Sequence, residues 1–359
     1  MEYSQKHFTL VLMTDEIYIQ RCIDLAKAGK GYVAPNPMVG AVLVHNNRII
    51  GEGFHEQYGQ AHAEVNCIQN VREKDKHLIA SSTMYVSLEP CAHFGKTPPC
   101  TDLLIQQRVK RVVIGTKDIF SKVNGQGIAK LQNAGIEVLT GIGEKECIAL
   151  NKRFFTFHRH KRPYIILKWA QTNNNIIGVQ EGKRLMITNE LTNRLVHKWR
   201  SEEAAILVGT QTVLKDNPSL TNRLYSGHHP LRLCIDRHLS VPKDFGIVDD
   251  TADTVIFNAK EDKTEGTNVY KKIDFKESVI NQVLDFCYAQ HIQSILVEGG
   301  AHLLQSFINE GIWDECRMIT NTGLFVEKGV KAPVLKNAAY LYSRYVDGDK
   351  VDYYKKKNQ

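Results

Sequence analysis

The sequence has no apolar run that approaches the ~18 residues of a membrane-spanning helix. Its eight cysteines follow no regular spacing, and a chain of 359 residues has no need of a disulfide framework. Internal repeats, low-complexity segments and a Gly-x-Gly-x-x-Gly dinucleotide motif are also missing. Residues 1–12 are too short for a signal peptide with a cleavage site, and Met13 is an alternative start. These absences argue against membrane and disulfide-rich secreted classes and predict a cytoplasmic protein in a reducing compartment.

The composition is that of an ordinary globular protein, with 43% hydrophobic and 24% charged residues. At ~150 residues per domain, the length predicts two domains. The formal net charge of +7 fits a phosphate-bearing substrate or a nucleic acid. Apart from Lys355, Lys356 and Lys357 the basic residues are scattered, so a solvated surface accounts for most of them.

The stretch from His62 to Cys100 carries the clearest chemistry. His62, Cys91 and Cys100 offer one imidazole and two thiolates, which suit a tetrahedral Zn²⁺ ion with water in the fourth position. Glu64 follows His62 by two residues and is placed to move protons to and from that water. Together they match the signature of zinc deaminases, which attack an amino-bearing ring carbon. The alternative is that these residues bind no metal and are two buried thiols and a surface histidine.

His93 is a rival ligand, since it follows Cys91 by two residues. It ranks below His62, because a Cys-x-His pair would leave the His62-Ala63-Glu64 motif unexplained. A closed, purely structural zinc site would need His93 as a fourth protein ligand.

The first half of the chain alternates helices with short apolar strands. We expect a helix that begins after an N-cap at Thr14, then a hairpin of two strands joined at Asn46-Asn47. After Cys100, alternating helix and strand patterns predict parallel βα units around one sheet. Asn36 and His55 fall on loops near the metal helix and are candidates for binding a pyrimidine edge. Turn chemistry and a surface histidine are the competing interpretation.

The second half is a further α/β unit that follows a basic boundary stretch at residues 151–163. Strands are expected at residues 164–172, 204–209, 231–236 and 254–257, with helices at residues 189–200 and 278–290. A buried strand then ends in Glu298-Gly299-Gly300 at the start of a helix, where free N–H groups suit a phosphate. A plain turn is the alternative here, as it is at Asp216-Asn217-Pro218.

Eight motifs in this order resemble one family over nearly the whole chain: PNPMVGAV, GEGFH, HAEV, EPCAHFGKTPPC, VNGQG, LKWA, GTQTVLKDNPSLTNR and VEGGAHLLQSF. This family is the bifunctional riboflavin-biosynthesis proteins, a diaminohydroxyphosphoribosylaminopyrimidine deaminase fused to a 5-amino-6-(5-phosphoribosylamino)uracil reductase. The resemblance implies an α/β protein of two domains. Residues 1–150 would form a cytidine-deaminase-like α/β/α sandwich with one zinc ion, and residues 151–359 a dihydrofolate-reductase-like domain that uses NADPH. It also implies a small phosphoribosyl-pyrimidine substrate and a homo-oligomer, a dimer or tetramer, with neither nucleic acid nor membrane as partner.

The resemblance also assigns roles to residues. It makes His62, Cys91 and Cys100 the zinc ligands and Glu64 the proton donor, with Asp118 as a weaker substrate contact. The positions that match NADPH-binding residues are Ala170, Met186, Thr212, Asp216 and Gly300. The positions that match substrate-binding residues are Arg184, Arg200, Leu220, Arg223 and Glu298. Arg200 and Arg223 suit bidentate phosphate recognition, against the alternatives of a solvated helix face and a loop charge.

Departures from the family pattern concentrate in the second half. Asn174, Asn175 and Ile176 stand where the family usually has Asp, Gly and a basic residue, and Met186 stands where tryptophan is common. The usual proline-containing stretch after Met318 is also missing. A deaminase with an inactive reductase-like domain is therefore the alternative function. A nucleic-acid deaminase is a more distant rival, because it would not need the second domain or the Gly-Lys-Thr-Pro-Pro-Cys insert.

Overall fold

The computed structural model describes residues 15–94, 98–119, 124–179 and 185–357. The chain forms two compact units, and the division falls between Lys161 and Arg162. The sequence put the boundary at residue 150, before helix α6 (Lys152–His160). The helix belongs to the first unit, because its Phe154 and Phe155 are buried against Leu88 of that unit. None of the helices in the described ranges combines the length and apolarity that a bilayer span requires.

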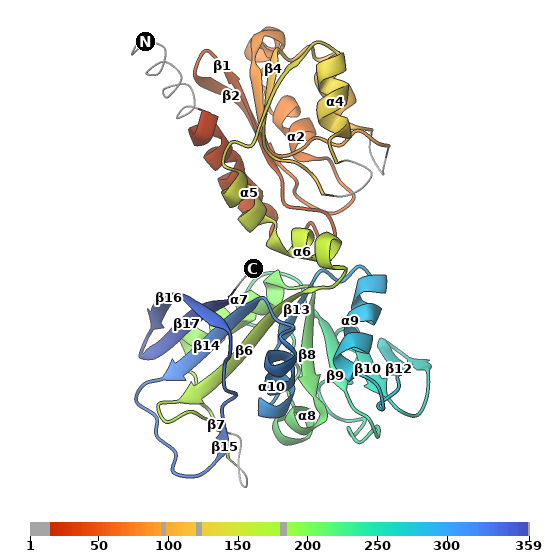
Figure 1. Cartoon of the computed structure of the whole chain (residues 1–359), viewed down its shortest axis with the longest axis vertical. Helices are drawn as coiled ribbons and strands as arrows, with labels where there is room; N and C mark the ends of the chain where they lie inside the picture. Colours follow the sequence, from red (N-terminus) through yellow and green to blue (C-terminus); the bar gives the residue numbers. More distant parts are fainter. Residues whose placement is uncertain (1–14, 95–97, 120–123, 180–184, 358–359) are drawn as a thin grey trace. The chain divides into compact units, whose positions relative to one another are not determined.

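The first unit is built on a five-stranded sheet in the order β2-β1-β3-β4-β5 (Figure 1). β1 runs antiparallel to β2 and β3, whereas β3, β4 and β5 are parallel, as the alternation of helix and strand predicts. A helix covers residues 15–26, and the expected cap at Thr14 lies outside the described residues. The remaining elements are η1 (Lys27–Gly29), β1 (Gly40–His45), β2 (Arg48–Phe54), α2 (Ala63–Gln69), η2 (Glu73–Ser81), β3 (Thr83–Leu88), α3 (Cys100–Gln106), β4 (Arg111–Thr116), α4 (Gln126–Asn133), β5 (Glu137–Thr140) and α5 (Glu144–Leu150).

Alternation along the strands gives this sheet two buried faces. Ala41 and Leu43 of β1 face a cluster with α2, α3 and α4, whereas Val42 and Val44 face one with the helix at residues 15–26 and Cys147 of α5. Successive strand side chains point to opposite faces, so helices on both sides produce the predicted α/β/α sandwich. The predicted hairpin is confirmed, because Asn46 and Asn47 both have positive φ angles, as a two-residue turn with right-handed twist requires.

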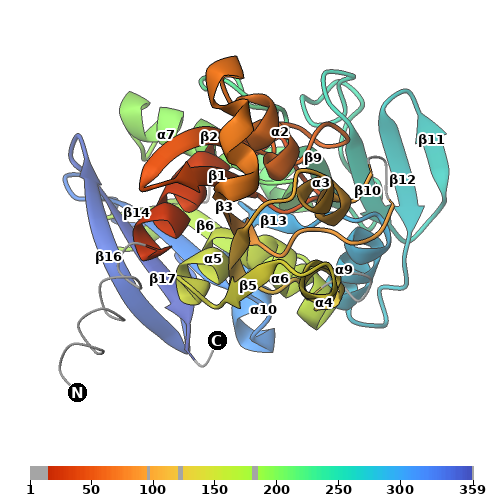
Figure 2. The same ribbon diagram turned by 90° about the horizontal axis from the view of Figure 1, so that it is seen from above.

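The second unit contains a ten-stranded mixed sheet in the order β11-β12-β10-β9-β8-β13-β6-β14-β17-β16 and a small β15-β7 sheet. Figure 2 shows β11 and β16 at opposite edges of the large sheet. The strands of the second unit are β6 (Tyr164–Thr172), β7 (Ile176–Gly178), β8 (Ala205–Gly209), β9 (Leu231–Ile235), β10 (Thr254–Asn258), β11 (Lys263–Glu265), β12 (Asn268–Lys272), β13 (Ser294–Val297), β14 (Glu315–Asn321), β15 (Val330–Lys331), β16 (Ala338–Val346) and β17 (Asp349–Lys356). Its helices are α7 (Glu190–Glu202), α8 (Thr210–Asp216), α9 (Val279–Ala289) and α10 (Ala301–Glu310).

Helices cover both faces of the large sheet. Ile165 and Leu167 of β6 pack with α9 and α10, whereas Tyr164 and Ile166 pack with α7. The even-numbered side chains of β6 therefore face α7. The expected helix starts are confirmed, because the side chain of Asn189 caps α7 and that of Ser278 caps α9.

Candidate active sites

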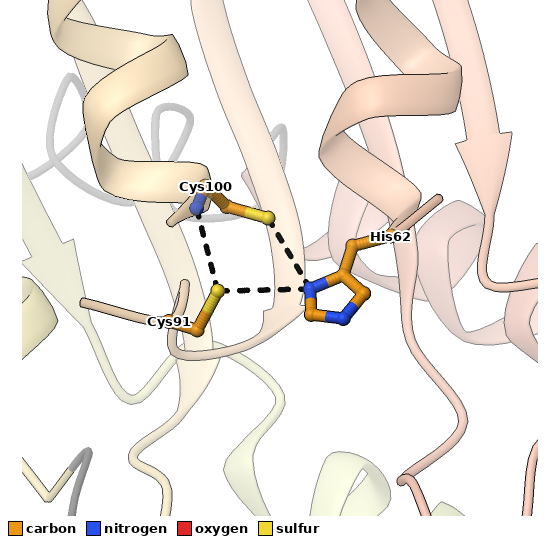
Figure 3. A group of neighbouring side chains, drawn as sticks. All are labelled: His62, Cys91 and Cys100. Atoms are coloured by element: carbon orange, nitrogen blue, oxygen red, sulfur yellow. Dashed lines mark hydrogen bonds between the residues drawn. The ribbon is translucent and has the colours of Figure 1, made fainter. Parts of the chain in front are cut away.

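The three predicted metal ligands meet in the first unit (Figure 3). His62 Nδ1 lies 3.6 Å from Cys91 Sγ and 3.4 Å from Cys100 Sγ, and all three ligand atoms lie within 4.8 Å of one another. Among the described residues, His93 is not part of this group. Residues 95–97 of the insert, which include the Gly-Lys-Thr sequence, lie outside the described ranges.

These separations fit a single zinc ion. Tetrahedral coordination with Zn–S near ~2.3 Å and Zn–N near ~2.0 Å places sulfur and nitrogen ligands roughly 3.5 Å apart. The two measured nitrogen–sulfur distances agree with that value. One imidazole and two thiols also form the donor set of a catalytic zinc site with an open position.

Two helix starts and one strand end hold these ligands. His62 is the N-cap of α2, Cys100 is the first residue of α3, and Cys91 follows β3 after Glu89-Pro90. The backbone N–H of Cys100 donates to Cys91 Sγ at 3.3 Å, and Thr101 N–H donates to the Cys91 carbonyl at 3.2 Å. The first turn of α3 thus fixes both thiols.

The electrostatics of this group suit a thiolate ligand beside a proton carrier. Hydrogen bonding to Cys100 lowers the pKa of the Cys91 thiol against the opposing effect of burial, and His62 adds to the lowering. Burial raises the pKa of Glu64, which is 3% exposed, and the neighbouring Cys91 raises it further. A raised pKa favours the protonated form of a carboxyl group, which suits a group that carries protons in acid and base catalysis.

Asn36 and His55 lie beside the metal group. The His55 ring is 5.3 Å from the His62 ring, centroid to centroid, and Asn36 Nδ2 lies 3.2 Å from His55 Nε2. His55 Nδ1 lies 3.0 Å from the Ala61 carbonyl, to which it donates as a neutral imidazole, and burial lowers the pKa of His55. His55 is only 2% exposed, so its interpretation as a surface histidine was wrong.

In the second unit, Arg200 and Glu298 form a buried pair. Arg200 Nε and Nη2 donate to the two carboxylate oxygens of Glu298 at 3.1 and 2.8 Å. Lys168 Nζ lies 3.5 Å from the same carboxylate. Burial alone would raise the pKa of Glu298, but Arg200 and Lys168 outweigh it and lower the pKa to about 2. The carboxylate is therefore ionised throughout the physiological range.

This pair changes the interpretation of Arg200. Its side chain is 13% exposed, so it is no solvated helix face, and its Nη1 also donates to the Thr221 carbonyl at 3.4 Å. Nε and Nη2 of Arg200 both bind Glu298 in the structure, and bidentate phosphate recognition by Arg200 stays a prediction. The other predicted phosphate ligand, Arg223, is exposed and donates from Nη1 to Thr221 Oγ1 at 2.9 Å. Sequence reasoning missed Lys168, although its even position on β6 places it on the α7 face.

The loop at residues 217–223 carries two of the predicted substrate residues, Leu220 and Arg223. Leu220 is buried with a φ angle of 56°, an uncommon conformation that the surroundings must impose. Asn217 accepts from Gly246 N–H at 2.8 Å, and His197 Nδ1 accepts from Arg223 N–H at 2.8 Å. Hydrogen bonds therefore hold the loop at both of its ends.

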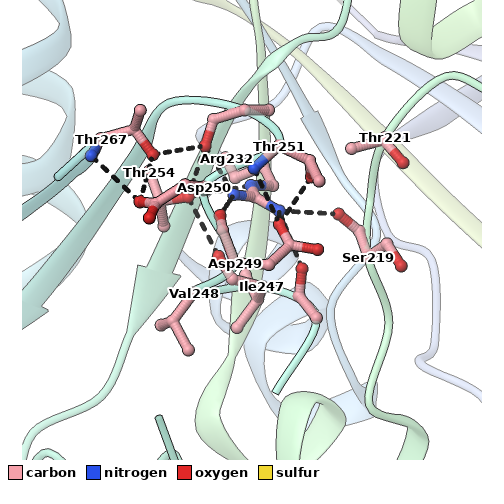
Figure 4. Close-up of polar contacts among 12 residues, drawn as sticks. Ser219, Thr221, Arg232, Ile247, Val248, Asp249, Asp250, Thr251, Thr254 and Thr267 are labelled. Carbon is pink, nitrogen blue, oxygen red and sulfur yellow. Dashed lines mark hydrogen bonds and ion pairs between the residues drawn. The ribbon is translucent and has the colours of Figure 1, made fainter. Parts of the chain in front are cut away.

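A buried arginine of β9 fastens the middle of this loop (Figure 4). The Arg232 side chain is fully buried and donates to Thr254 Oγ1, Asp249 Oδ1 and four backbone carbonyls. These carbonyls belong to Ser219, Gly246, Asp249 and Ala252. Arg232 thus ties Ser219, the neighbour of Leu220, to the segment at residues 246–252.

Three of the predicted cofactor positions gather at the carboxyl ends of two adjacent parallel strands, β8 and β13. A Cβ atom on Gly300 would lie 3.1 Å from Thr212 Oγ1, so the starts of α8 and α10 approach closely. Asp216 is one helical turn after Thr212 and lies on the same side of α8. Ala170 lies on the α7 face of β6, Met186 is exposed, and Arg184 lies outside the described residues.

Asn174 has a defined contact in place of the family's aspartate. Its Nδ2 donates to the Val326 carbonyl at 2.8 Å, and its Oδ1 accepts from Thr172 Oγ1 at 2.7 Å. An aspartate would not donate to that carbonyl. The neighbouring Asn175 has a φ angle of 62°, as expected of an asparagine in place of glycine.

His197→Asn is expected to make the stability of the second unit less sensitive to acid. Burial lowers the pKa of His197 to about 4, with Arg200 and Arg223 adding to the effect. When the pH decreases from ~6.5 to ~4, the unfolded chain binds a proton at this histidine and the folded chain does not. The free energy of unfolding therefore decreases as the pH decreases through this window. Asparagine keeps an acceptor for Arg223 N–H but does not titrate.

The measurement is urea unfolding of both proteins at pH 7 and pH 5. The wild type is expected to lose about 2 kcal/mol more than the variant between these values. Equal losses would contradict a neutral His197 in the folded protein.

Comparisons with known proteins divide the chain in the same way. Residues 12–116 match the cytidine and deoxycytidylate deaminase zinc-binding region, and residues 163–325 match the RibD C-terminal domain. The riboflavin biosynthesis protein RibD of Aquifex aeolicus is 40% identical over 308 residues, which cover 84% of this chain and 85% of that one. The protein of the same name from Actinobacillus pleuropneumoniae is 38% identical over 90% of this chain and 87% of its own length.

Two solved structures are similar to this chain over almost its full length. A diaminohydroxyphosphoribosylaminopyrimidine deaminase/5-amino-6-(5-phosphoribosylamino)uracil reductase from Thermotoga maritima matches with a TM-score of 0.87 and 36% identity, covering 96% of this chain and 99% of that one. RibD of Acinetobacter baumannii matches with a TM-score of 0.86 and 29% identity over the same shares. These likenesses confirm the predicted two-domain α/β architecture. At 40% identity over most of both chains, the chain belongs to the RibD family of riboflavin biosynthesis proteins.

Proposed function

We propose that this chain catalyses two successive steps of riboflavin biosynthesis. Its first unit deaminates 2,5-diamino-6-(5-phosphoribosylamino)pyrimidin-4-one, and its second unit uses NADPH to reduce the ribosyl group of the product to a ribityl chain. The observation that carries the proposal is the convergence of His62, Cys91 and Cys100 next to a buried Glu64. The buried Glu298 group with Arg200 and Lys168 supports a second site.

In the deaminase unit, His62, Cys91 and Cys100 would hold zinc, which activates water as a Lewis acid when bound. Glu64 takes a proton from the attacking water and delivers it to the amino nitrogen, which leaves as ammonia. Its burial supports this role, because burial raises the pKa of the carboxyl group and so makes it easier for the group to accept a proton. Asn36 would bind the pyrimidine edge beside this group, and the buried His55, whose ring nitrogens face Asn36 and the Ala61 carbonyl, would hold its amide in place.

In the reductase unit, Arg223 and Leu220 would contact the phosphoribosyl substrate from the loop at residues 217–223, and Arg184 would contact it from outside the described ranges. Arg200 and Lys168 hold the Glu298 carboxylate in one orientation toward the substrate. NADPH supplies a hydride when bound. Thr212, Asp216 and the helix start at Gly300 would hold the cofactor, and Ala170 and Met186 would lie at the edges of the cofactor site.

The test uses purified, zinc-replete protein and the synthetic diamino substrate. We expect ammonia release without NADPH, and substrate-dependent loss of NADPH absorbance when the deaminated compound is supplied. Ammonia release without NADPH oxidation would establish the alternative of a deaminase with an inactive second domain. No conversion of either compound would contradict the proposal as a whole.

Cys91→Ser is expected to lower zinc content from one ion per chain to well below half, because a serine hydroxyl replaces a thiolate ligand. The matched control is Cys147→Ala, which alters a buried thiol of the same unit in the cluster on the other face of the sheet. Metal analysis after dialysis makes the comparison. Equal zinc content in both variants would show that Cys91 is no ligand.

We further propose a homo-oligomer, a dimer or tetramer, that forms through the edge strand β16. Its exposed apolar and aromatic side chains support this, since monomeric proteins seldom leave such an edge open. These side chains are Tyr340, Leu341, Tyr342 and Tyr345. Light scattering is expected to show a multimer for the wild type and for the control Tyr58→Lys on the first unit, and a smaller species for Leu341→Lys with Tyr345→Lys. A monomeric wild type would refute this interface.

A cytoplasmic location completes the proposal. All eight cysteines are free in the structure, which is typical of proteins in a reducing compartment. Cell fractionation with an antibody to the chain tests the location.

A further inference from the structure

Glu89 is a buried acid that the proposed chemistry does not use. It stands between the end of β3 and the metal ligand Cys91, and it is 4% exposed. Its Oε2 accepts the backbone N–H groups of Asp118 at 3.2 Å and Gly125 at 3.0 Å. Its Oε1 accepts those of Gly127 at 3.0 Å and Ile128 at 3.3 Å. Four backbone donors thus surround one carboxylate.

These donors take the place of a counter-ion. In the described part of the chain, no lysine or arginine forms an ion pair with Glu89. A carboxylate that accepts several backbone N–H groups is stabilised in its charged form, and the bonds it makes are stronger than those between neutral groups. Glu89 also donates its own N–H to the Thr116 carbonyl at 3.0 Å, which fixes the end of β3 beside the end of β4.

The contact joins two parts of the first unit. One is Pro90-Cys91, which carries a metal ligand, and the other comprises Asp118 and the start of α4. A Cβ atom on Gly127 would lie only 2.2 Å from the Pro90 carbonyl oxygen, so the first turn of α4 rests directly on the ligand-bearing backbone. This close approach admits glycine alone.

We propose that Glu89 is a positioning residue of the deaminase site. Its carboxylate locks Pro90-Cys91 to the segment that carries Asp118, so that the metal group and the substrate-contact residue keep a fixed relation. The inference rests on the proposed deaminase function and adds a role for a residue that touches neither metal nor substrate.

Glu89→Gln tests this at nearly constant size. A glutamine offers one acceptor oxygen, and its NH₂ group would face two N–H donors, so one pair of bonds is lost and replaced by repulsion. We expect kcat/KM for deamination to fall ~10²-fold, as small misplacements in active sites do, with KM rising because Asp118 moves. Zinc should remain at one ion per chain but exchange faster with a chelator. Reduction of the deaminated substrate should be unchanged.

Two further variants and the wild type complete the experiment. Glu73→Gln, an exposed carboxylate of the same unit with a side chain 87% exposed, is expected to match the wild type throughout. Glu89→Asp keeps the charge but reaches only one pair of donors, and its kcat/KM should fall between those of the wild type and Glu89→Gln. It decides the question if Glu89→Gln does not fold.

The outcomes separate the two proposals. A wild type that releases no ammonia would remove the deaminase function itself. An active wild type with equal kcat, KM and chelation rate in Glu89→Gln, or in Glu89→Asp if only that variant folds, would overturn the positioning role. Activity that falls only in proportion to zinc content would also overturn it, because Glu89 would then serve the fold alone.

Discussion

Glu64→Gln is expected to retain zinc and to lower the rate of deamination by at least ~10²-fold, the effect typical of a lost acid and base group. The amide has nearly the same shape as the carboxyl but neither accepts nor delivers the proton on which ammonia release depends. Glu64 supplies none of the three converging ligand atoms, so the metal group stays intact. Ammonia release at saturating substrate and zinc analysis of the same preparation give the two quantities.

The matched control is Glu56→Gln, an exposed carboxylate of the same unit, which is expected to deaminate like the wild type. NADPH oxidation with the deaminated substrate should be the same in all three proteins. Normal deamination by Glu64→Gln would show that another group moves the proton. Loss of zinc together with activity would make Glu64 part of the metal site instead.

Glu298→Gln is expected to abolish most reductase activity and to destabilise the second unit. The substitution leaves the charges of Arg200 and Lys168 buried without their counter-ion, and breaking a buried pair in this way costs roughly 3–5 kcal/mol. The variant also removes a carboxylate that is ionised at every physiological pH and that we propose contacts the substrate. NADPH oxidation should fall more than ~10²-fold, since misplaced binding groups alone have effects of that size.

Urea unfolding and NADPH oxidation measure the two effects, with deamination as the internal reference. Glu190→Gln provides the contrast, because Glu190 pairs with Arg194 on the surface of α7 with its side chain 77% exposed. Removing that pair should change the free energy of unfolding by less than ~1 kcal/mol. A change of less than ~1 kcal/mol in the free energy of unfolding of Glu298→Gln would mean that water hydrates Arg200 and Lys168 and that they do not need the carboxylate.

The metal group was predictable because its geometry is local. His62 and Cys100 stand at helix starts that the sequence pattern marks, and the Asn46-Asn47 turn follows from the backbone preference of asparagine. The partners of Glu298 were not predictable in the same way. Arg200 and Lys168 reach that carboxylate from other elements, and only the assembled sheet brings β6 and α7 to the end of β13.

The same limit explains the contacts and residues that sequence reasoning missed. Arg200 has the residue type of a phosphate ligand, but its guanidinium is already occupied by an acid almost one hundred residues away. Glu89 was treated as part of a motif, because nothing in the sequence shows that the backbone of Gly125 and Gly127 folds back onto it. The division after Lys161 falls within the predicted boundary stretch at residues 151–163, but its exact place depends on the packing of Phe154 on Leu88, which is not visible in the sequence.

The Arg232 anchor has a consequence for how this protein tolerates sequence change. Four of its six acceptors are backbone carbonyl oxygens, which every amino acid supplies. Side chains at Ser219 and Ala252 can therefore vary without removing the bonds that set the path of the loop. The path of the loop at residues 217–223 is held by the bond from Arg232 to the Ser219 carbonyl and by the bonds of Asn217 and His197, while its exposed side chains stay open to mutation. Exposed side chains of this loop, which we propose contacts the substrate, can thus be exchanged while backbone hydrogen bonds keep its course.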